Sequence, residues 1–245
     1  MSAKPSRPAR GKATGGRRIA LFGGTFDPIH LGHLAVAHAT LRTFRLDRIF
    51  FIPSGHPPHK PLGELLPYEH RFAMTALACA GNRRFVPSLA ECADGAGPTA
   101  FYSVDTVRRF QSEYDRPGDR IYFIVGADSF LQIATWKDYQ TLLGLCDFVV
   151  ASRPGFRTDA LLQVIPPELL ADPAQGASKG AQRKNSRGLR SIALRGSTVH
   201  LLDTVASRVS ATDVRHRLDR GRSVHGLVPP RVEEYITKQA LYRPQ

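Results

Sequence analysis

Two histidines spaced three residues apart stand shortly after a pair of glycines. In the segment GGTFDPIHLGH, Gly23 and Gly24 follow a short apolar run, and His30 and His33 come near its end. Glycines at the end of a strand let a ligand approach the backbone and expose N–H groups to an anion. If a helix begins here, the spacing places both imidazoles on one helix face, beside the positive end of the helix dipole. The pattern predicts a site that donates hydrogen bonds to phosphate oxygens.

Other residues of the same segment are candidates for the same site. Thr25 and Phe26 continue the glycine turn and offer backbone groups to a nucleotide, while Asp27 is a candidate for fixing the turn or a water near a metal. The chain contains neither GxxxxGK[ST] nor GxGxxG, which excludes those two phosphate-binding loops.

A second candidate phosphate site lies near the end of the chain. In RVSATDVRHRL, Ser210 and Thr212 offer hydroxyls at a predicted helix start, and Arg215 lies three residues beyond Thr212. A helix N-terminus together with a guanidinium group suits a triphosphate. An ordinary capped surface helix is the alternative for this segment taken alone.

Short β-branched or aromatic runs alternate along the chain with segments of helical period. The expected strands are 17–22, 48–53, 84–91, 120–126, 146–152 and 198–203, and the expected helices are 31–43, 67–81, 103–114 with Ser103 as N-cap, one opening at Ser210, and 230–241. This alternation predicts an α/β fold, a Rossmann-like parallel sheet with helices on both faces. Ligands bind such sheets at the carboxyl ends of the strands, which directs attention to the loops after Phe22, Ile52, Val125 and Leu202.

Composition bounds the remaining possibilities. The chain has 245 residues, of which 42% are hydrophobic, and three scattered cysteines. It lacks an apolar run of the roughly 18 residues that a membrane helix needs, and the cysteines form no CxxC, so we expect a soluble, cytoplasmic protein. Composition predicts a disordered basic N-terminal tail over 1–17 and a single domain over 18–242, with a low-complexity basic insertion at about 172–196. The insertion is expected to be a disordered loop, a lid over the nucleotide being the alternative.

The net charge of +13 suggests an alternative function from another class of protein, namely that of a basic nucleic-acid-binding protein. Most of the excess positive charge lies in the tail and in and around the insertion. Aromatic residues are sparse in both, so no base-stacking platform accompanies the charge. We therefore expect no specific nucleic-acid partner.

The two phosphate-site segments resemble a known superfamily. GGTFDPIHLGH resembles the (T/H)xGH signature of the nucleotidyltransferases, in the FDPIHLGH form of the adenylyltransferases, and RVSATDVRHRL resembles their second signature, ISSTxxR. Val209 and Ala211 replace the usual Ile and second Ser. The resemblance implies the nucleotidylyl transferase fold and places Ser210, Thr212 and Arg215 at ATP.

In PSGHPPHKP, after the second expected strand, His59 and Lys60 present positive or donor groups over the expected phosphate site. The intervening segments FYSVDTV, FIVGADSFLQIATW and DFVVASRPG look like those of nicotinate-nucleotide adenylyltransferase, as does the ending LVPPRVEEYITKQALY. The resemblance covers about residues 18–156 and 199–242. It implies that His59, Ser103, Asp128 and Trp136 bind the nicotinate nucleotide, and that Lys60 acts with His30, His33 and Arg215 on the phosphates. Trp136 suits stacking on a pyridinium ring, with core filling as the alternative. Asp128 has the wrong charge for the nicotinate carboxylate and is expected to orient other groups or a ribose hydroxyl.

The implied reaction transfers AMP from ATP to nicotinate mononucleotide, giving deamido-NAD and pyrophosphate. Mg²⁺ is the implied cofactor, held mainly by ATP oxygens. His56 and His59 lack a third ligand at suitable spacing, so no protein-held metal is expected. Nicotinamide mononucleotide and pantetheine phosphate remain alternative acceptors. The implied partners are the two substrates, without a membrane, and association into a homo-oligomer is left open.

Overall fold

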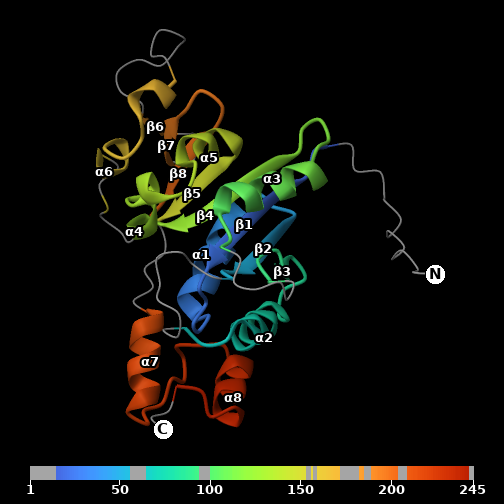
Figure 1. The fold of residues 1–245 in the computed structure, drawn as a ribbon, viewed down its shortest axis with the longest axis vertical. Coiled ribbons are helices and arrows are strands. Elements are labelled where there is room, and N and C mark those ends of the chain that lie inside the picture. Colours follow the sequence, from blue (N-terminus) through green and yellow to red (C-terminus); the bar gives the residue numbers. More distant parts are fainter. Residues whose placement is uncertain are drawn as a thin grey trace, which may run out of the picture.

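The computed structural model describes residues 15–55, 65–93, 100–152, 156, 159–171, 182–184, 189–203 and 209–242. Within these residues, eight strands form one sheet in the order β3-β2-β1-β4-β5-β8-β7-β6 (Figure 1). The strands are β1 (Arg18–Gly24), β2 (Arg48–Pro53), β3 (Phe85–Pro87), β4 (Arg120–Gly126), β5 (Asp147–Ala151), β6 (Gln182–Lys184), β7 (Arg190–Ala193) and β8 (Thr198–Leu202). The strands from β3 to β8 in this order pair in parallel, and β7 and β6 continue the sheet antiparallel.

The helices cover both faces of the sheet. They are α1 (Leu31–Phe44), α2 (Tyr68–Cys79), α3 (Ser103–Glu113), α4 (Ala127–Phe130), α5 (Tyr139–Leu145), α6 (Asp159–Leu162), α7 (Ala211–Asp219) and α8 (Pro230–Lys238), with 3₁₀ turns η1 (Ile133–Thr135) and η2 (Pro167–Leu169). Among the described helices, none has the length and apolar character needed to cross a membrane. The predicted α/β architecture is confirmed.

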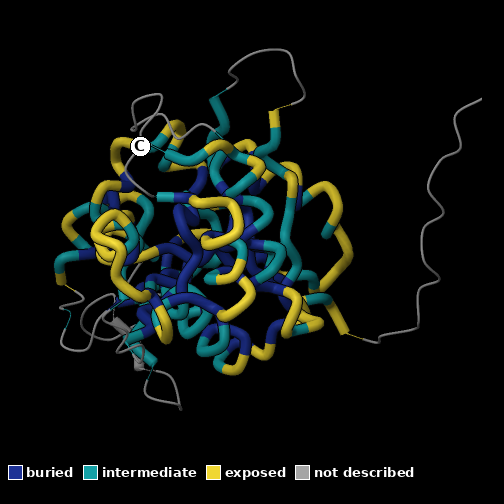
Figure 2. Tube along the Cα trace, turned by 90° about the horizontal axis from the view of Figure 1, so that it is seen from below, coloured by how far each residue is buried: buried dark blue, intermediate teal, exposed yellow. Residues whose placement is uncertain are grey.

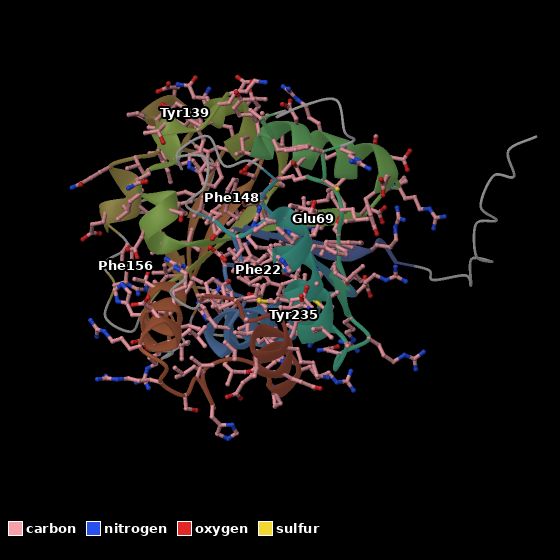
Figure 3. All side chains as sticks on the ribbon, turned by 60° about the horizontal axis from the view of Figure 1, so that its bottom comes forward. Phe22, Glu69, Tyr139, Phe148, Phe156 and Tyr235 are labelled. Atoms are coloured by element: carbon pink, nitrogen blue, oxygen red, sulfur yellow. The ribbon has the colours of Figure 1, made fainter. Side chains whose placement is uncertain are left out.

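Alternation along the central strand β1 divides the interior into two cores. Ala20 and Phe22 belong to one core, and Ile19 and Leu21 belong to the other, because successive side chains of a strand point to opposite faces. The first core is closed by α1, α2, α7 and α8, and the second by α3, α4, α5 and α6. The tube view shows the strands buried in the middle (Figure 2). In the side-chain view, Phe22 and Phe148, one from each core, lie inside the molecule (Figure 3).

Three expected boundaries are wrong. The third strand covers 85–87 rather than 84–91, and it is an edge strand in which Pro87 offers no N–H to continue a ladder. The last helix ends at Lys238 rather than Leu241. Ser103 is the first residue of α3 rather than its N-cap, which is Tyr102, and no side chain caps this helix.

Part of the expected low-complexity insertion is ordered in the sheet. Strand β7 pairs with β8, and β6 pairs with β7. Ile192 is 0% exposed and Leu194 7% exposed, so this short segment buries two apolar side chains in the second core. Average composition misses it because two apolar residues at strand spacing, with a partner strand beside them, offset the ordering entropy. The rest of the insertion lies outside the described residues.

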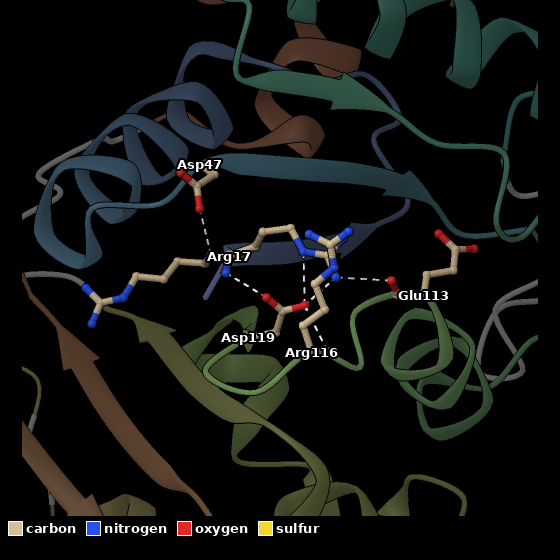
Figure 4. A network of polar contacts seen from close by, with 6 residues as sticks. Arg17, Asp47, Glu113, Arg116 and Asp119 are labelled. Atoms are coloured by element: carbon tan, nitrogen blue, oxygen red, sulfur yellow. Dashed lines mark hydrogen bonds and ion pairs between the residues drawn. The ribbon is translucent and has the colours of Figure 1, made fainter. Parts of the chain in front are cut away.

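Arg17 also belongs to the fold, although composition places it in the tail. Its backbone N–H donates to Asp119 Oδ1 at 2.7 Å, and its guanidinium group forms an ion pair with the same carboxylate (Figure 4). A carboxylate just before β4 thus fixes the residue just before β1. The described part of the chain begins at residue 15, so the rest of the expected tail, 1–14, lies outside it.

Candidate active site

The two predicted phosphate-binding segments meet at the carboxyl ends of the central strands. Strand β1 lies between β2 and β4, so the strand order reverses beside it. In open parallel sheets the connections on the two sides of such a point leave a crevice in which ligands bind. The first motif, residues 23–33, follows β1 here, and Asp128 follows β4. The second motif, described from residue 209 to residue 218, reaches this place from the far end of the chain.

Phe26 anchors the loop after β1. Its backbone has φ of 46°, in the left-handed region, and its ring is 1% exposed. The ring packs edge-on against Phe22 and His33, at centroid distances of 5.6 and 5.0 Å. A Cβ on Gly24 would lie 3.2 Å from this ring, so glycine permits the close approach. The Phe26 side chain is therefore committed to the core, and a contact with a nucleotide would come from its backbone.

His30 and His33 lie together as their spacing predicts. His30 is the N-cap of α1, and the two rings stack with centroids 3.7 Å apart. The backbone N–H of His30 donates to His33 Nδ1 at 3.2 Å, which leaves the proton of a neutral His33 ring on Nε2. Within the described chain, the buried Nδ1 of His30 has no hydrogen-bond partner. The pair therefore presents ring nitrogens that a bound ligand can satisfy.

Burial keeps both rings neutral. It lowers the pKa of His30 to about 4, and it lowers the pKa of His33 well below the usual value, with the neighbouring His30 adding to the effect. At neutral pH the pair thus offers hydrogen bonds rather than full positive charge. The sequence predicts the donors but not this protonation state, which depends on how deeply the rings are packed.

Arg215 joins the second motif to the first. Its Nη1 donates to the backbone oxygen of Asp27 at 2.6 Å, and its Nη2 donates to Thr212 Oγ1 at 3.4 Å. Helix α7 begins as predicted, with Ser210 as N-cap, whose Oγ accepts from the backbone N–H of Asp213 at 3.1 Å. A guanidinium group and a helix N-terminus therefore lie beside the glycine turn.

Arg71 holds two loops of the site and is not predicted from the sequence. It is 2% exposed, and its guanidinium group donates to the backbone oxygens of Thr25, Ser54, Gly55 and Leu66 at 2.7–3.3 Å. Burial lowers its pKa from the usual value. The sequence signal that could have revealed Arg71 is its position on the otherwise apolar side of a helix. A cation buried there needs several hydrogen-bond acceptors around it.

Glu91 is a second residue that the sequence reasoning misses. Its carboxylate accepts from Thr106 Oγ1 at 3.0 Å, on α3, and from the Gly55 N–H at 3.4 Å, in the loop after β2. A Cβ on Gly55 would lie 2.2 Å from the Glu91 backbone oxygen, so this contact requires glycine. Burial raises the pKa of Glu91. The carboxyl group ties the loop after β2 to the first turns of α3.

The sequence neighbours of two expected nicotinate-binding residues are in contact. Lys137, next to Trp136, lies 4.2 Å above the ring of Tyr102, next to Ser103. Trp136 is half-buried and meets Phe123 edge-on at 6.1 Å, so it is partly a core residue. Asp128 is exposed on α4, and no hydrogen bond or ion pair joins it to Ser103 or Trp136. Its place in the site rests on the position of β4 alone.

Two expected residues, His59 and Lys60, lie outside the described chain, in 56–64. The described chain before them ends with Ser54 and Gly55, whose carbonyls Arg71 holds. In the part of the chain that the structure covers, no three His, Cys, Asp or Glu side chains gather as a metal site.

Comparison with known proteins agrees with the observed fold. The model of the cytidylyltransferase-like family matches residues 21–217. Probable nicotinate-nucleotide adenylyltransferases from Moorella thermoacetica and Geobacter sulfurreducens are both 40% identical, over 93% and 92% of this chain and 93% and 98% of theirs. A Plasmodium falciparum nicotinic acid mononucleotide adenylyltransferase, solved in complex with NaAD, superimposes with a TM-score of 0.63 at 16% identity, over 92% of this chain and 97% of that one.

Proposed function

Because this chain belongs to the nicotinate-nucleotide adenylyltransferases of the cytidylyltransferase-like family, we propose that it transfers AMP from ATP to nicotinate mononucleotide. The products are nicotinate adenine dinucleotide (deamido-NAD) and pyrophosphate. The observation that carries the proposal is the junction of the two motifs, in which Arg215 bonds to Asp27 beside the stacked His30–His33 pair. Donors from residues almost 190 positions apart thus converge at one strand end.

The reaction needs alignment and charge stabilisation more than proton transfer. An oxygen of the 5′-phosphate of nicotinate mononucleotide attacks the α-phosphorus of ATP, and the bond from that phosphorus to the β-phosphate oxygen breaks. The attacking phosphate is already an anion, so no general base is required. Catalysis then rests on holding the two phosphates in line and on donors that meet the growing negative charge.

The residues of the site divide this work between them. Backbone groups of Gly23, Gly24, Thr25 and Phe26, with the N-terminus of α7 at Ser210 and Thr212, receive the triphosphate. His30 and His33 donate hydrogen bonds to phosphate oxygens, and Arg215 supplies positive charge. The remaining phosphate and nucleotide contacts are assigned to Lys60 and His59, which follow Gly55 in the sequence.

Mg²⁺ enters with ATP as part of the substrate. No cluster of three metal-ligand side chains occurs among the described residues. The carboxylate within the first motif, Asp27, already accepts a hydrogen bond from Tyr242. Mg²⁺ prefers phosphate oxygens and water when a protein offers few carboxylates. The metal would neutralise charge on the leaving pyrophosphate.

The nicotinate end is assigned to the side of the site formed by α3 and the turn after η1. Trp136 offers its indole face to the pyridinium ring, and Ser103 with nearby backbone N–H groups at the start of α3 offers donors to the carboxylate. Asp128 would hold a ribose hydroxyl or orient its neighbours. This arrangement favours an aromatic acceptor over pantetheine phosphate.

Pyrophosphate release tests the proposal directly. The assay contains ATP and Mg²⁺, with nicotinate and nicotinamide mononucleotides compared in parallel. We expect strong preference for the acid, and a loss of about 10²–10³-fold in kcat for His33→Ala, the size typical of one removed transition-state donor. His38→Ala is the matched control, since His38 lies on the same helix but its ring packs against Phe85.

The alternative outcomes separate the rival functions. Equal use of both mononucleotides would retain the chemistry and overturn the acceptor assignment. Release with pantetheine phosphate instead would move the chain to another adenylyltransferase activity. No release with any acceptor would overturn the proposal and make polyanion binding by the basic stretches the next hypothesis.

A further inference from the structure

The last described residue returns to the first motif. Tyr242 Oη donates to Asp27 Oδ1 at 2.5 Å, across 215 positions of sequence. Chain reversal places it there. Helix α8 ends at Lys238, Ala240 and Tyr242 adopt φ of 49° and 62°, and Leu241 between them is buried in the first core. Left-handed backbone is unfavourable for residues with a Cβ, so packing must enforce this conformation.

Asp27 lies between this tyrosine and two arginines. Arg71 interacts electrostatically with the Asp27 carboxylate, but its guanidinium group already donates to four backbone oxygens, which leaves Arg215 as the arginine that could pair with Asp27. The Asp27 side chain is 1% exposed, and its backbone oxygen, rather than its carboxylate, accepts from Arg215. Among the residues that the structure covers, no carboxylate lies within ion-pair distance of the Arg215 guanidinium group, whose other contact is the Thr212 hydroxyl. A buried carboxylate so close to an arginine would ordinarily form a bidentate pair with it.

We propose that Tyr242 is a positioning residue that occupies the Asp27 carboxylate and thereby leaves the Arg215 guanidinium group available to the triphosphate of ATP. The inference rests on the proposed adenylyl transfer. A phenol suits this task because it donates a hydrogen bond without adding a competing charge. An Asp27–Arg215 pair would instead neutralise the cation that the substrate must meet.

The protonation of Tyr242 agrees with this role. Burial and the neighbouring Asp27 raise the pKa of the phenol, which therefore remains a donor at any pH at which the protein works. The C-terminal residues thus contribute to the site through Asp27 rather than through contact with substrate.

Tyr242→Phe tests the proposal because it removes one hydroxyl and keeps the packed ring. Tyr235→Phe is the matched control. Its hydroxyl joins α8 to α2 through a hydrogen bond with His70 Nδ1 at 2.9 Å, and it makes no hydrogen bond with Asp27. The Kd of MgATP by titration calorimetry, the KM of each substrate, kcat and the unfolding midpoint are measured for each variant.

For Tyr242→Phe we expect the Kd and KM of ATP to rise about tenfold, the size of one lost hydrogen bond to a charged group. The KM of nicotinate mononucleotide and kcat should remain within about twofold of their starting values, since the geometry at the acceptor is unchanged. Tyr235→Phe should shift the unfolding midpoint without changing ATP affinity. A Tyr242→Phe protein with the original ATP affinity would overturn the inference.

A second substitution tests the mechanism itself. Asn at position 27 cannot form an ion pair, so Tyr242→Phe combined with Asp27→Asn should recover most of the lost ATP affinity. If the double variant binds ATP as weakly as Tyr242→Phe alone, the tyrosine does not act through the carboxylate and the inference fails. If the unsubstituted protein neither binds MgATP nor releases pyrophosphate, the proposed function fails instead.

Discussion

The arginines at the two ends of the parallel sheet have different kinds of partner. At the amino end, Arg17 forms an ion pair with Asp119 (Figure 4), and Arg120 Nη1 lies 3.6 Å from Asp147 Oδ2. At the carboxyl end, Arg71 and Arg215 bond to backbone oxygens and a hydroxyl. At the amino end, carboxylates of the same chain neutralise the arginines. The carboxyl end leaves the Arg215 guanidinium group without a carboxylate partner among the described residues, so an anionic ligand can neutralise it.

The comparison separates stability from function. Partly buried ion pairs with several hydrogen bonds, like that of Arg17, fix the strand starts. Buried neutral histidines and arginines without carboxylates are costly to the folded protein, and such costs concentrate at functional sites. Perturbing the amino end should therefore change stability more than turnover, while the carboxyl end should respond in both.

The largest expected effect is on stability and comes from Arg71. This arginine lies at the carboxyl end of the sheet but has a structural role, so its substitution tests the separation of stability from function. Arg71→Met leaves four buried carbonyls without their donor and should lower the free energy of unfolding by about 3 kcal/mol. The KM of nicotinate mononucleotide should rise as well, since Ser54 and Gly55 lead into the loop of His59 and Lys60. Urea unfolding and steady-state kinetics measure the two effects. Arg83→Met, at an exposed arginine, is the control, and equal stability of the two variants would contradict the prediction.

Acid titration should sharpen the comparison by separating the two ends in pH. Burial lowers the pKa of His30 to about 4, so between pH 6.5 and 4 the unfolded chain takes up a proton that the folded chain does not. The free energy of unfolding should therefore fall with falling pH in this window, by at most about 3 kcal/mol for this residue. His33 and His200, whose pKa values are also lowered by burial, add to the same step.

A second step belongs to the amino end. The hydrogen bonds from Arg17 lower the pKa of Asp119 to about 2, so its stabilisation is complete above pH 3.8 and is lost as the pH falls toward 2. Chemical unfolding across pH 2–8 should show both steps. The His30→Asn substitution should make the first fall in unfolding free energy smaller, and Asp119→Asn should make the second smaller. If the first fall is unchanged in His30→Asn, its assignment to His30 is wrong.

The smallest expected effect concerns Arg17 itself. Arg17→Ala should lower the free energy of unfolding by about 1–2 kcal/mol, because a partly exposed pair with good geometry is lost. The value of kcat should stay within about twofold. Arg116→Ala is the matched control, since Arg116 reaches Asp119 through its backbone N–H, which alanine retains. A loss of turnover in Arg17→Ala without loss of stability would break the comparison between the two ends.

Local spacing determined much of this protein from the sequence. Five of the six expected strands, the helices opening near His30 and at Ser210, and the shared face of His30 and His33 were predicted correctly, because each depends on residues a few positions apart. The third strand is shorter than expected, and the strands at 182–184 and 190–193 were not predicted. The family resemblance predicted that the two distant motifs form one site. The roles of the individual site residues stay predictions, and His59 and Lys60 lie outside the described chain.

Tertiary structure alone decided the features that depend on distant partners. The four carbonyls around Arg71 come from two loops, the one after β1 and the one between β2 and α2. The bond from Tyr242 to Asp27 spans nearly the whole chain, and the strand at 190–193 exists because β8 lies beside it. The neutral state of the histidines likewise follows from burial, which no spacing reports. Sequence patterns register contacts between near neighbours, whereas burial and long-range hydrogen bonds are set only once the whole chain has packed.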